Sequence, residues 1–475
     1  MTTAPARLAV FGGMPRIHFS PQRNWMNDPN GLVFHEGRYH LYYQYNPNGC
    51  DHGYMSWGHA SSADLVTWDE HPVALRYDDE REVYSGSIVW DENGVAGFGP
   101  ALLAFYTAHA PNRRHQAQAI AYSHDGGYTW TDYEGNPVLD RQSGDFRDPK
   151  VLRYRGEAGE YWVLAAVEAV QQRVVFYRSD DLREWSLLSE FAAPEVGEGI
   201  WECPDLFPLV VDGVEKWVLI ISLGMAPVVG GFGSIYFVGS FDGTTFVPDG
   251  GSTQLDYGRD NYAGVTFFGL PDEQRTLIGW MCNWIYGREL PVIPEEPRRG
   301  TMTLARRLSL ASVDGRVALR QTPIAPEVET VADAREPVGA APTRLPLSVP
   351  ECALVEITLD LGDATGARVR LRHDADGYGG VVLGYDRGTG EVTLDRSAVG
   401  PQFPDSFRAM QMMPTSGGSL IQLTLWADVN SVEIFADDGL ATLSSVVDVA
   451  AGDGVTVEGV GGQVVASVTV AVPVA

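Results

Sequence analysis

The stretch Tyr39–Tyr45, with the sequence YHLYYQY, decides the fold, because apolar and aromatic runs of the same kind recur along the chain. Their centres lie about 55 to 62 residues apart, and a fixed period with several short strands per unit is typical of a β-propeller. We therefore predict five blades, with central strands at Tyr39–Tyr45, Ala101–Ala108, Tyr161–Val167, Lys216–Leu223 and Thr276–Trp284.

A second signal keeps the same period: a turn aspartate followed closely by an aromatic residue. It is present in four units, as Asp64…Trp68, Asp125…Trp130, Asp181…Trp185 and Asp242…Phe246. Most propeller repeats are nearer about 40 to 50 residues. We therefore expect long loops between the strands of each blade.

Three acidic residues, Asp28, Asp148 and Glu202, stand at nearly the same point of three units, and each is followed within two positions by a proline. They precede the central strand of their blade by roughly 13 to 17 residues, where the innermost strand of a propeller blade should run. Each motif alone is also typical of a turn or a surface ion pair. Three such acids in register are improbable as independent turns, so we predict that their carboxylates face one another in the axial channel.

Carboxylates that face one another in a partly dry channel suit glycoside hydrolysis, in which one attacks the anomeric carbon and another, with a raised pKa, protonates the leaving oxygen. The shorter Asp28 suits the nucleophile, and Glu202, with its extra methylene and Trp neighbour, suits the proton donor. Arg147 would hold Asp148 ionised to bind sugar hydroxyls and offset developing positive charge. Nearby aromatic residues can form walls for a sugar ring: Trp25, Trp57, Tyr84 and Trp284.

Composition excludes several classes of partner. The formal net charge of −28 argues against nucleic acid and anionic membranes, which are themselves polyanions. No apolar run approaches the length of a membrane span, and residues 1–14 contain only Leu8–Phe11 as an apolar stretch, too short for a signal-peptide core. The four cysteines lack paired spacing. We expect a reduced, cytoplasmic protein, although a chain whose native signal had been replaced by Met1 would look identical.

The chain divides into a propeller over residues 1–320, a proline-rich linker over 321–345 and a C-terminal β-sandwich over 346–475. The linker is predicted from six prolines between Pro323 and Pro350. Beyond it apolar and polar residues alternate strictly, as in Val355–Leu361, which indicates half-buried antiparallel strands. No helix-period segment of ordinary length is present, so the predicted fold class is all-β.

These motifs together resemble glycoside hydrolase family 32, the invertase, inulinase and levanase group. The resemblance spans the whole chain and rests on Trp25–Gly31, Tyr42–Pro47, Trp57–Ala60, Tyr84–Ser87, Arg147–Pro149, Glu202–Asp205, Asp256–Gly258 and Ser431–Phe435. It implies a five-bladed propeller with a β-sandwich and a retaining mechanism without metal or cofactor. It also implies that Asp28 is the nucleophile, Glu202 the acid/base and Asp148 the stabiliser of the transition state. The residues that match positions shaping the family's fructose pocket are Asn27, Gln44, Trp57, Ser85, Arg147, Asp256 and Trp284.

The chain departs from the family pattern at Tyr84, at Asn261 and in Pro297–Gly300, which bear on leaving-group preference rather than on the chemistry. The expected activity is exo-acting release of terminal β-linked fructose from sucrose or fructo-oligosaccharides. A fructosyltransferase would use the same carboxylates. An inverting arabinan- or xylan-active propeller would share three acids but not Trp25–Gly31, and a non-catalytic fructan-binding propeller would normally have lost an acid. The sequence leaves open the choice among sucrose, inulin and levan, and the oligomeric state.

Overall fold

The computed structural model describes residues 13–156, 159–292, 294–295, 297–377, 379–400, 402–448 and 452–474. Most of Met1–Met14, where no signal-peptide core was expected, lies outside these ranges. Within them, helical structure is limited to short 3-10 turns, namely η1 (Pro194–Val196), η2 (Pro227–Val229), η3 (Asp272–Gln274), η4 (Gly287–Glu289), η5 (Asp405–Phe407) and η6 (Asp437–Gly439). None of these helices has the length and apolarity needed to cross a membrane. The all-β prediction is confirmed.

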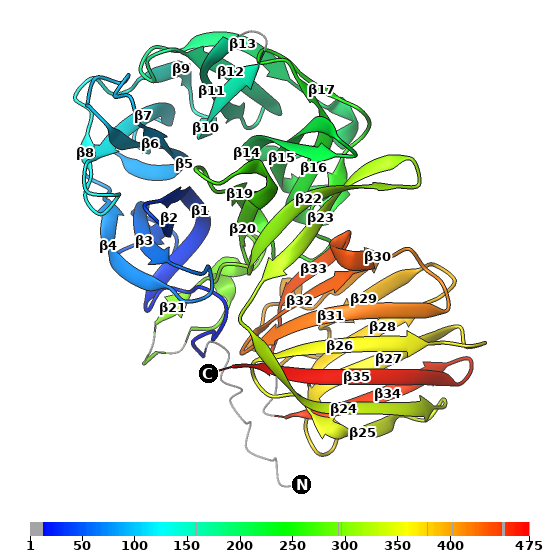
Figure 1. The fold of residues 1–475 in the computed structure, drawn as a ribbon. Coiled ribbons are helices and arrows are strands. Elements are labelled where there is room, and N and C mark those ends of the chain that lie inside the picture. The colour runs from blue at the N-terminus through cyan, green and yellow to red at the C-terminus, as the bar shows by residue number, and fades with distance from the viewer. Residues whose placement is uncertain are drawn as a thin grey trace.

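The first domain consists of five sheets around a common centre (Figure 1). The first contains β21 (Arg298–Arg299), β1 (Asn24–His35), β2 (Arg38–Asn46), β3 (Ser56–Ser62) and β4 (Asp69–Leu75). The second contains β5 (Glu82–Asp91), β6 (Ala101–Ala110), β7 (His115–Ser123), β8 (Thr131–Asp132) and β9 (Leu139–Ser143). The third contains β10 (Phe146–Gly156), β11 (Gly159–Glu168), β12 (Arg173–Ser179) and β13 (Ser186–Phe191). The fourth contains β14 (Ile200–Val211), β15 (Val214–Ala226), β16 (Gly231–Phe241), β17 (Phe246–Pro248) and β18 (Thr253–Gln254). The fifth contains β19 (Tyr262–Thr266), β20 (Thr276–Trp280), β22 (Ala305–Val313) and β23 (Arg316–Ile324).

These five sheets are the predicted blades. The first four apolar runs that set the period lie in β2, β6, β11 and β15, each of which pairs with the innermost strand of its blade, and the fifth run begins with β20 and extends four residues past its end at Trp280. The innermost strands β1, β5, β10, β14 and β19 contact one another in that order, and β19 also contacts β1. The three predicted catalytic acids lie on β1, β10 and β14, which are innermost strands of three blades.

The turn aspartates have the same role in each of their four blades. The Oδ1 atom of Asp64 accepts hydrogen bonds from the backbone N–H groups of Val66 and Thr67, which closes the turn between β3 and β4. Asp125, Asp181 and Asp242 make the equivalent pair of bonds in the next three blades. Aspartate recurs there because its short carboxylate can satisfy two backbone donors in a tight turn.

Each inner strand carries a β-bulge near its start, where two of its residues face one residue of the neighbouring strand. The register shifts lie between Met26 and Pro29, Val83 and Gly86, Arg147 and Lys150, Glu202 and Asp205, and Tyr262 and Val265. A bulge re-aims side chains and leaves N–H groups unpaired, which is why proline is tolerated there. Aligned on these bulges, Glu202, Asp148 and Asp28 occupy three successive positions rather than a single one.

The second domain is a sandwich of two six-stranded sheets (Figure 1). One sheet contains, in spatial order, β24 (Val328–Val338), β35 (Val464–Pro473), β26 (Ala353–Asp360), β31 (Leu420–Asp428), β32 (Ser431–Ala436) and β33 (Ala441–Val446). The other contains β25 (Thr343–Ser348), β34 (Gly454–Val460), β27 (Gly366–His373), β28 (Val381–Asp386), β29 (Glu391–Asp395) and β30 (Met410–Pro414).

The predicted linker over residues 321–345 is wrong. The propeller continues to Ile324 at the end of β23, and the sandwich begins with β24 at Val328. The prolines misled the prediction because β24 and β25 are edge strands of their two sheets. A proline that cannot donate to the ladder is tolerated on an edge.

Candidate active site

Asp28 lies in the bulge of β1 and receives three hydrogen bonds. Ser85 Oγ donates to Asp28 Oδ2 at 2.8 Å, and Asn27 Nδ2 donates to Asp28 Oδ1 at 3.1 Å. The Cys203 thiol donates to Asp28 Oδ2 at 3.6 Å. These donors come from β1, β5 and β14, so the position of the carboxylate is fixed by three blades at once. Ser85 and Asn27 were both predicted as site residues, and both lie at the carboxylate expected to be the nucleophile.

Asp148 lies beside Asp28 and shares Cys203 with it. The backbone N–H of Cys203 donates to Asp148 Oδ2 at 2.9 Å, and its thiol lies 3.7 Å from the same oxygen. Burial raises the pKa of the Cys203 thiol well above its usual range, so the sulfur keeps its single proton and can donate it to either carboxylate. Asp148 and Cys203 have φ values of 61° and 46°, a left-handed backbone that is costly outside glycine and concentrates at functional sites.

Glu202 is held at both carboxylate oxygens. Arg147 Nε donates to Glu202 Oε1 at 3.2 Å, and the Tyr262 hydroxyl donates to Glu202 Oε2 at 2.5 Å. Its side chain keeps 23% of its surface exposed, against 7% for Asp148. Glu202 is therefore the more accessible of these two acids, as a proton donor to a leaving group should be.

Burial and crowding perturb the two aspartates. Burial raises the pKa of Asp28 to about 6, and the charge of Glu202 adds to this shift, while the three hydrogen-bond donors oppose it. Burial also raises the pKa of Asp148 to about 7, with Arg147 opposing and Glu202 reinforcing the shift. Arg147 therefore favours the ionised form of Asp148, as expected, although its guanidinium lies nearer to Glu202, at 3.2 Å, than to Asp148, at 4.0 Å.

Of the four aromatic residues expected to contact a sugar ring, two have no exposed surface. Trp25 and Trp57 are completely buried, so neither presents a face to a sugar ring. Trp57 packs between the first two blades and donates its indole N–H to the carbonyl of Tyr84. Partly exposed aromatic surface comes instead from Tyr84, and from Trp284, which stacks on Trp25 at 5.8 Å between ring centroids.

Gln44 is buried opposite the bulge of β1, where its Nε2 donates to Asn30 Oδ1 at 2.9 Å and to the carbonyl of Val83 at 3.0 Å. It therefore supports the bulged strands of two blades. A direct contact with substrate stays a prediction for Gln44, as it does for Trp284.

Asp256 was predicted to bind substrate, and this is wrong. Its carboxylate accepts hydrogen bonds from Arg306 Nη1 at 2.9 Å, Ser444 Oγ at 2.7 Å and Thr442 Oγ1 at 3.1 Å. Ser444 and Thr442 belong to sandwich strand β33, and the Asp256 side chain is fully buried. Asp256 therefore lies at the interface of the two domains.

Sequence reasoning gave no role to Tyr262, Thr107 or the thiol of Cys203. Thr107, opposite the bulge of β5, accepts from the freed N–H of Asp148 at 2.9 Å and donates to the carbonyl of Ser85 at 3.3 Å. The only available signal was position: Tyr262 follows Asp260-Asn261 at the start of the fifth inner strand, at the bulge position where the fourth has Glu202.

Two family models match this chain. The model for the glycosyl hydrolases family 32 N-terminal domain matches residues 18–323, and that for the glycosyl hydrolases family 32 C terminal matches residues 317–471. The chain belongs to glycosyl hydrolases family 32. The boundary between these two models supports the end of the propeller near Ile324.

Named members of family 32 are similar over most of the chain. A levanase of Bacillus subtilis (strain 168) is 38% identical over 91% of this chain and 66% of its own length, and an extracellular exo-inulinase of Aspergillus ficuum is 36% identical over 90% of this chain and 88% of its own. The structure of a β-fructofuranosidase from Schwanniomyces occidentalis complexed with fructosyl-erythritol superposes with a TM-score of 0.87, at 28% identity, over 98% of this chain and 99% of that one.

Glu202→Gln is expected to slow the reaction according to the leaving group. Sucrose needs protonation of its glycosidic oxygen, so its turnover should fall by about 10² to 10⁴-fold, whereas an activated aryl β-fructofuranoside should lose much less. Steady-state rates on both substrates measure the difference, with the exposed Glu198→Gln as a matched control. An equal loss on both would remove the acid role from Glu202. Asp205 is no ready substitute, because it is fully buried and binds Lys150 Nζ at 3.0 Å.

Proposed function

We propose that this protein is an exo-acting β-fructofuranosidase that releases terminal fructose from sucrose or fructans by a retaining mechanism. The observation that carries the proposal is the cluster of three carboxylates on inner strands of three blades, each held by hydrogen-bond donors. The family 32 relatives support the substrate class, since they include a levanase and exo-inulinases, and a solved relative is complexed with fructosyl-erythritol.

The assignment of roles follows from the contacts. Asp28 attacks the anomeric carbon of fructose while Glu202 gives its proton to the leaving glycosidic oxygen, which forms a fructosyl ester on Asp28. Glu202, now ionised, takes a proton from water, which attacks the same carbon and frees Asp28. Asp148 offsets the positive charge that develops on the sugar ring in both steps. Arg147 and Tyr262 can hold the Glu202 carboxylate when it is ionised between the two steps.

Retention of configuration tests this mechanism. Double displacement requires carboxyl groups about 5 to 5.5 Å apart, too close for an intervening water molecule. Proton NMR in the first minutes of sucrose hydrolysis should therefore show β-fructofuranose before the anomers equilibrate. If the α anomer is seen first, the reaction inverts, and the arabinan-type alternative would replace the one proposed here.

Substrate preference within this activity requires a separate measurement. A panel of sucrose, kestose, inulobiose, levanbiose, inulin and levan, analysed by chromatography, would rank the substrates. Release of fructose alone from the polymers is expected for exo action, whereas internal oligosaccharides would indicate endo cleavage. Products longer than the substrate at high sucrose concentration would identify a fructosyltransferase instead.

A further inference from the structure

The segment 256–260, which leads into inner strand β19, is attached to the sandwich as if it were an additional strand. The N–H of Tyr257 donates to the carbonyl of Thr442 at 2.8 Å, and the N–H of Asp260 donates to that of Ser444 at 3.2 Å. In return, the N–H groups of Ser444 and Val446 donate to the carboxylates of Asp256 and Asp260. Strand β33 is the edge of its sheet, so this segment occupies an edge that would otherwise be unpaired.

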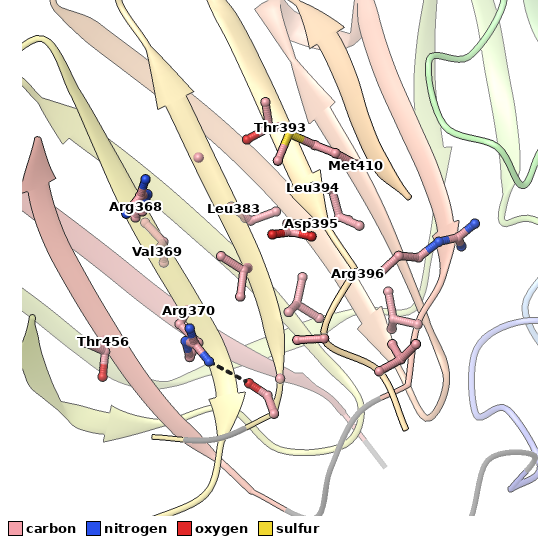
Figure 2. Close-up of a pocket in the computed structure, with 18 of the residues that line it drawn as sticks. Arg368, Val369, Arg370, Leu383, Thr393, Leu394, Asp395, Arg396, Met410 and Thr456 are labelled. Atoms are coloured by element: carbon pink, nitrogen blue, oxygen red, sulfur yellow. Dashed lines mark hydrogen bonds between the residues drawn. The ribbon is translucent and has the colours of Figure 1, made fainter. Parts of the chain in front are cut away.

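Side chains reinforce the attachment. Arg396, which follows β29 in the sandwich, donates to Asp260 Oδ2 at 2.8 Å and to the Tyr286 hydroxyl at 2.5 Å. Figure 2 is a close-up of a pocket in the sandwich, and it shows the Arg396 side chain extending away from the other labelled residues. Gly258 has no room for a larger residue, since a Cβ there would lie 1.9 Å from the carbonyl oxygen of Ser444. The segment therefore has a single close fit on β33.

Tyr262, whose hydroxyl binds Glu202, is two residues beyond Asp260 in the chain. Tyr262 is almost completely buried and its hydroxyl donates to Glu202 Oε2. We propose that the sandwich is a positioning element for catalysis: strand β33 and Arg396 fix segment 256–260, and this segment places Tyr262 and thereby the carboxyl group of Glu202. The proposal rests on the proposed role of Glu202 as proton donor, and it makes Tyr262, Asp260 and Arg396 positioning residues.

The first test is Tyr262→Phe, which removes one hydroxyl and keeps the ring. Because misplacement by about 1 Å can cost 10²-fold, kcat on sucrose should fall by about that factor, whereas an activated aryl fructoside should lose less than about fivefold. The ratio of the two kcat/KM values is the measurement. If both substrates lose equally, Tyr262 does not act through the acid.

The second test crosses the domain boundary. Arg396→Gln keeps a polar side chain but loses the charge that faces Asp260, and the aryl-to-sucrose ratio should rise by about fivefold or more, with partial recovery in Arg396→Lys. Leu425→Ala is the control, since it truncates a fully buried residue of the sandwich core. It should lower the melting temperature and leave the ratio within about twofold of the parent.

The results distinguish a failure of the positioning role of the sandwich from a failure of the proposed activity. If Arg396→Gln lowers the melting temperature but leaves the aryl-to-sucrose ratio within about twofold of the parent, as expected for Leu425→Ala, the sandwich only stabilises the propeller and the proposal is wrong. Should Arg396→Gln fail to fold, Gly258→Ala provides the same test, because it must displace the segment from β33. A parent protein that hydrolyses neither substrate would instead overturn the proposed function itself.

Discussion

Asp28→Asn is expected to abolish turnover of sucrose and fructans while the chain still folds. An amide cannot form the fructosyl ester, and removal of a nucleophile commonly costs several orders of magnitude in kcat. The loss should be equal on sucrose and on an activated aryl fructoside, because both need the same attack. This equality distinguishes Asp28→Asn from Glu202→Gln, in which the leaving group decides the loss.

The same substitution should not destabilise the protein at neutral pH. The pKa of Asp28 is about 6 in the fold, against about 3.9 for an ordinary aspartate, so the folded state retains a proton that the unfolded state loses between these values. Stability therefore falls as pH rises through this window, by up to about 3 kcal/mol, and the cost of the ionised carboxylate is fully present above pH 6. Asparagine removes that cost, although it can accept fewer of the bonds donated by Ser85, Asn27 and Cys203.

Melting temperatures of the parent and of Asp28→Asn between pH 4 and pH 8 measure this effect. We expect the variant to gain on the parent as pH rises, while the exposed Asp79→Asn follows the parent throughout. Activity within about tenfold of the parent, in protein with unchanged melting, would remove Asp28 from the role of nucleophile. A variant that loses stability most at pH 8 would contradict the electrostatic account.

The sequence predicted the ring of blades because its determinants are local. The central strands are short apolar runs, and the turn aspartates bind backbone groups only two to four residues ahead. The apolar runs recur in all five blades and the turn aspartates in four of them. The inner position of Asp28, Asp148 and Glu202 followed from the same period.

Features that depend on distant chain segments could not be predicted in this way. Asp256 is adjacent to motif residues in sequence, but its partners Thr442 and Ser444 are almost 190 residues away. Trp57 is next to polar residues in sequence and is nevertheless enclosed by the second blade. Arg147 precedes Asp148, yet its guanidinium is nearest to Glu202, because the bulge of β10 re-aims both side chains.

Contacts at the junction of the two domains indicate that the propeller needs the sandwich for its stability. A chain cut near Pro323 retains all five blades but loses the sandwich, and we expect it to be insoluble or far less heat-stable. Glu433 of the sandwich lies between Arg306 and His18, and both its oxygens accept hydrogen bonds from these cations. Although burial lowers the pKa of His18, its bonds to Asp428 and Glu433 raise it to about 9, so it is a cation at neutral pH.

Removal of the sandwich would leave these groups without their partners. The cut would also expose Ile17 and Leu304 of the propeller, which pack in one apolar cluster with Trp426 and Phe435 of the sandwich, and exposed apolar surface of this kind promotes aggregation. The cut also frees segment 256–260 from β33, and with it the strand that carries Tyr262.

The expected result is recovery of the truncated chain mainly in the insoluble fraction, or a melting temperature well below that of the full chain. Co-expression of residues 325–475 as a separate chain should restore solubility if the interface is the cause, and this is the control. A soluble propeller of unchanged heat stability that had lost only its binding to polymeric fructan would contradict the prediction. The sandwich would then act as a carbohydrate-binding module, and the ion pairs at Glu433 and Asp260 would contribute little, as exposed pairs do.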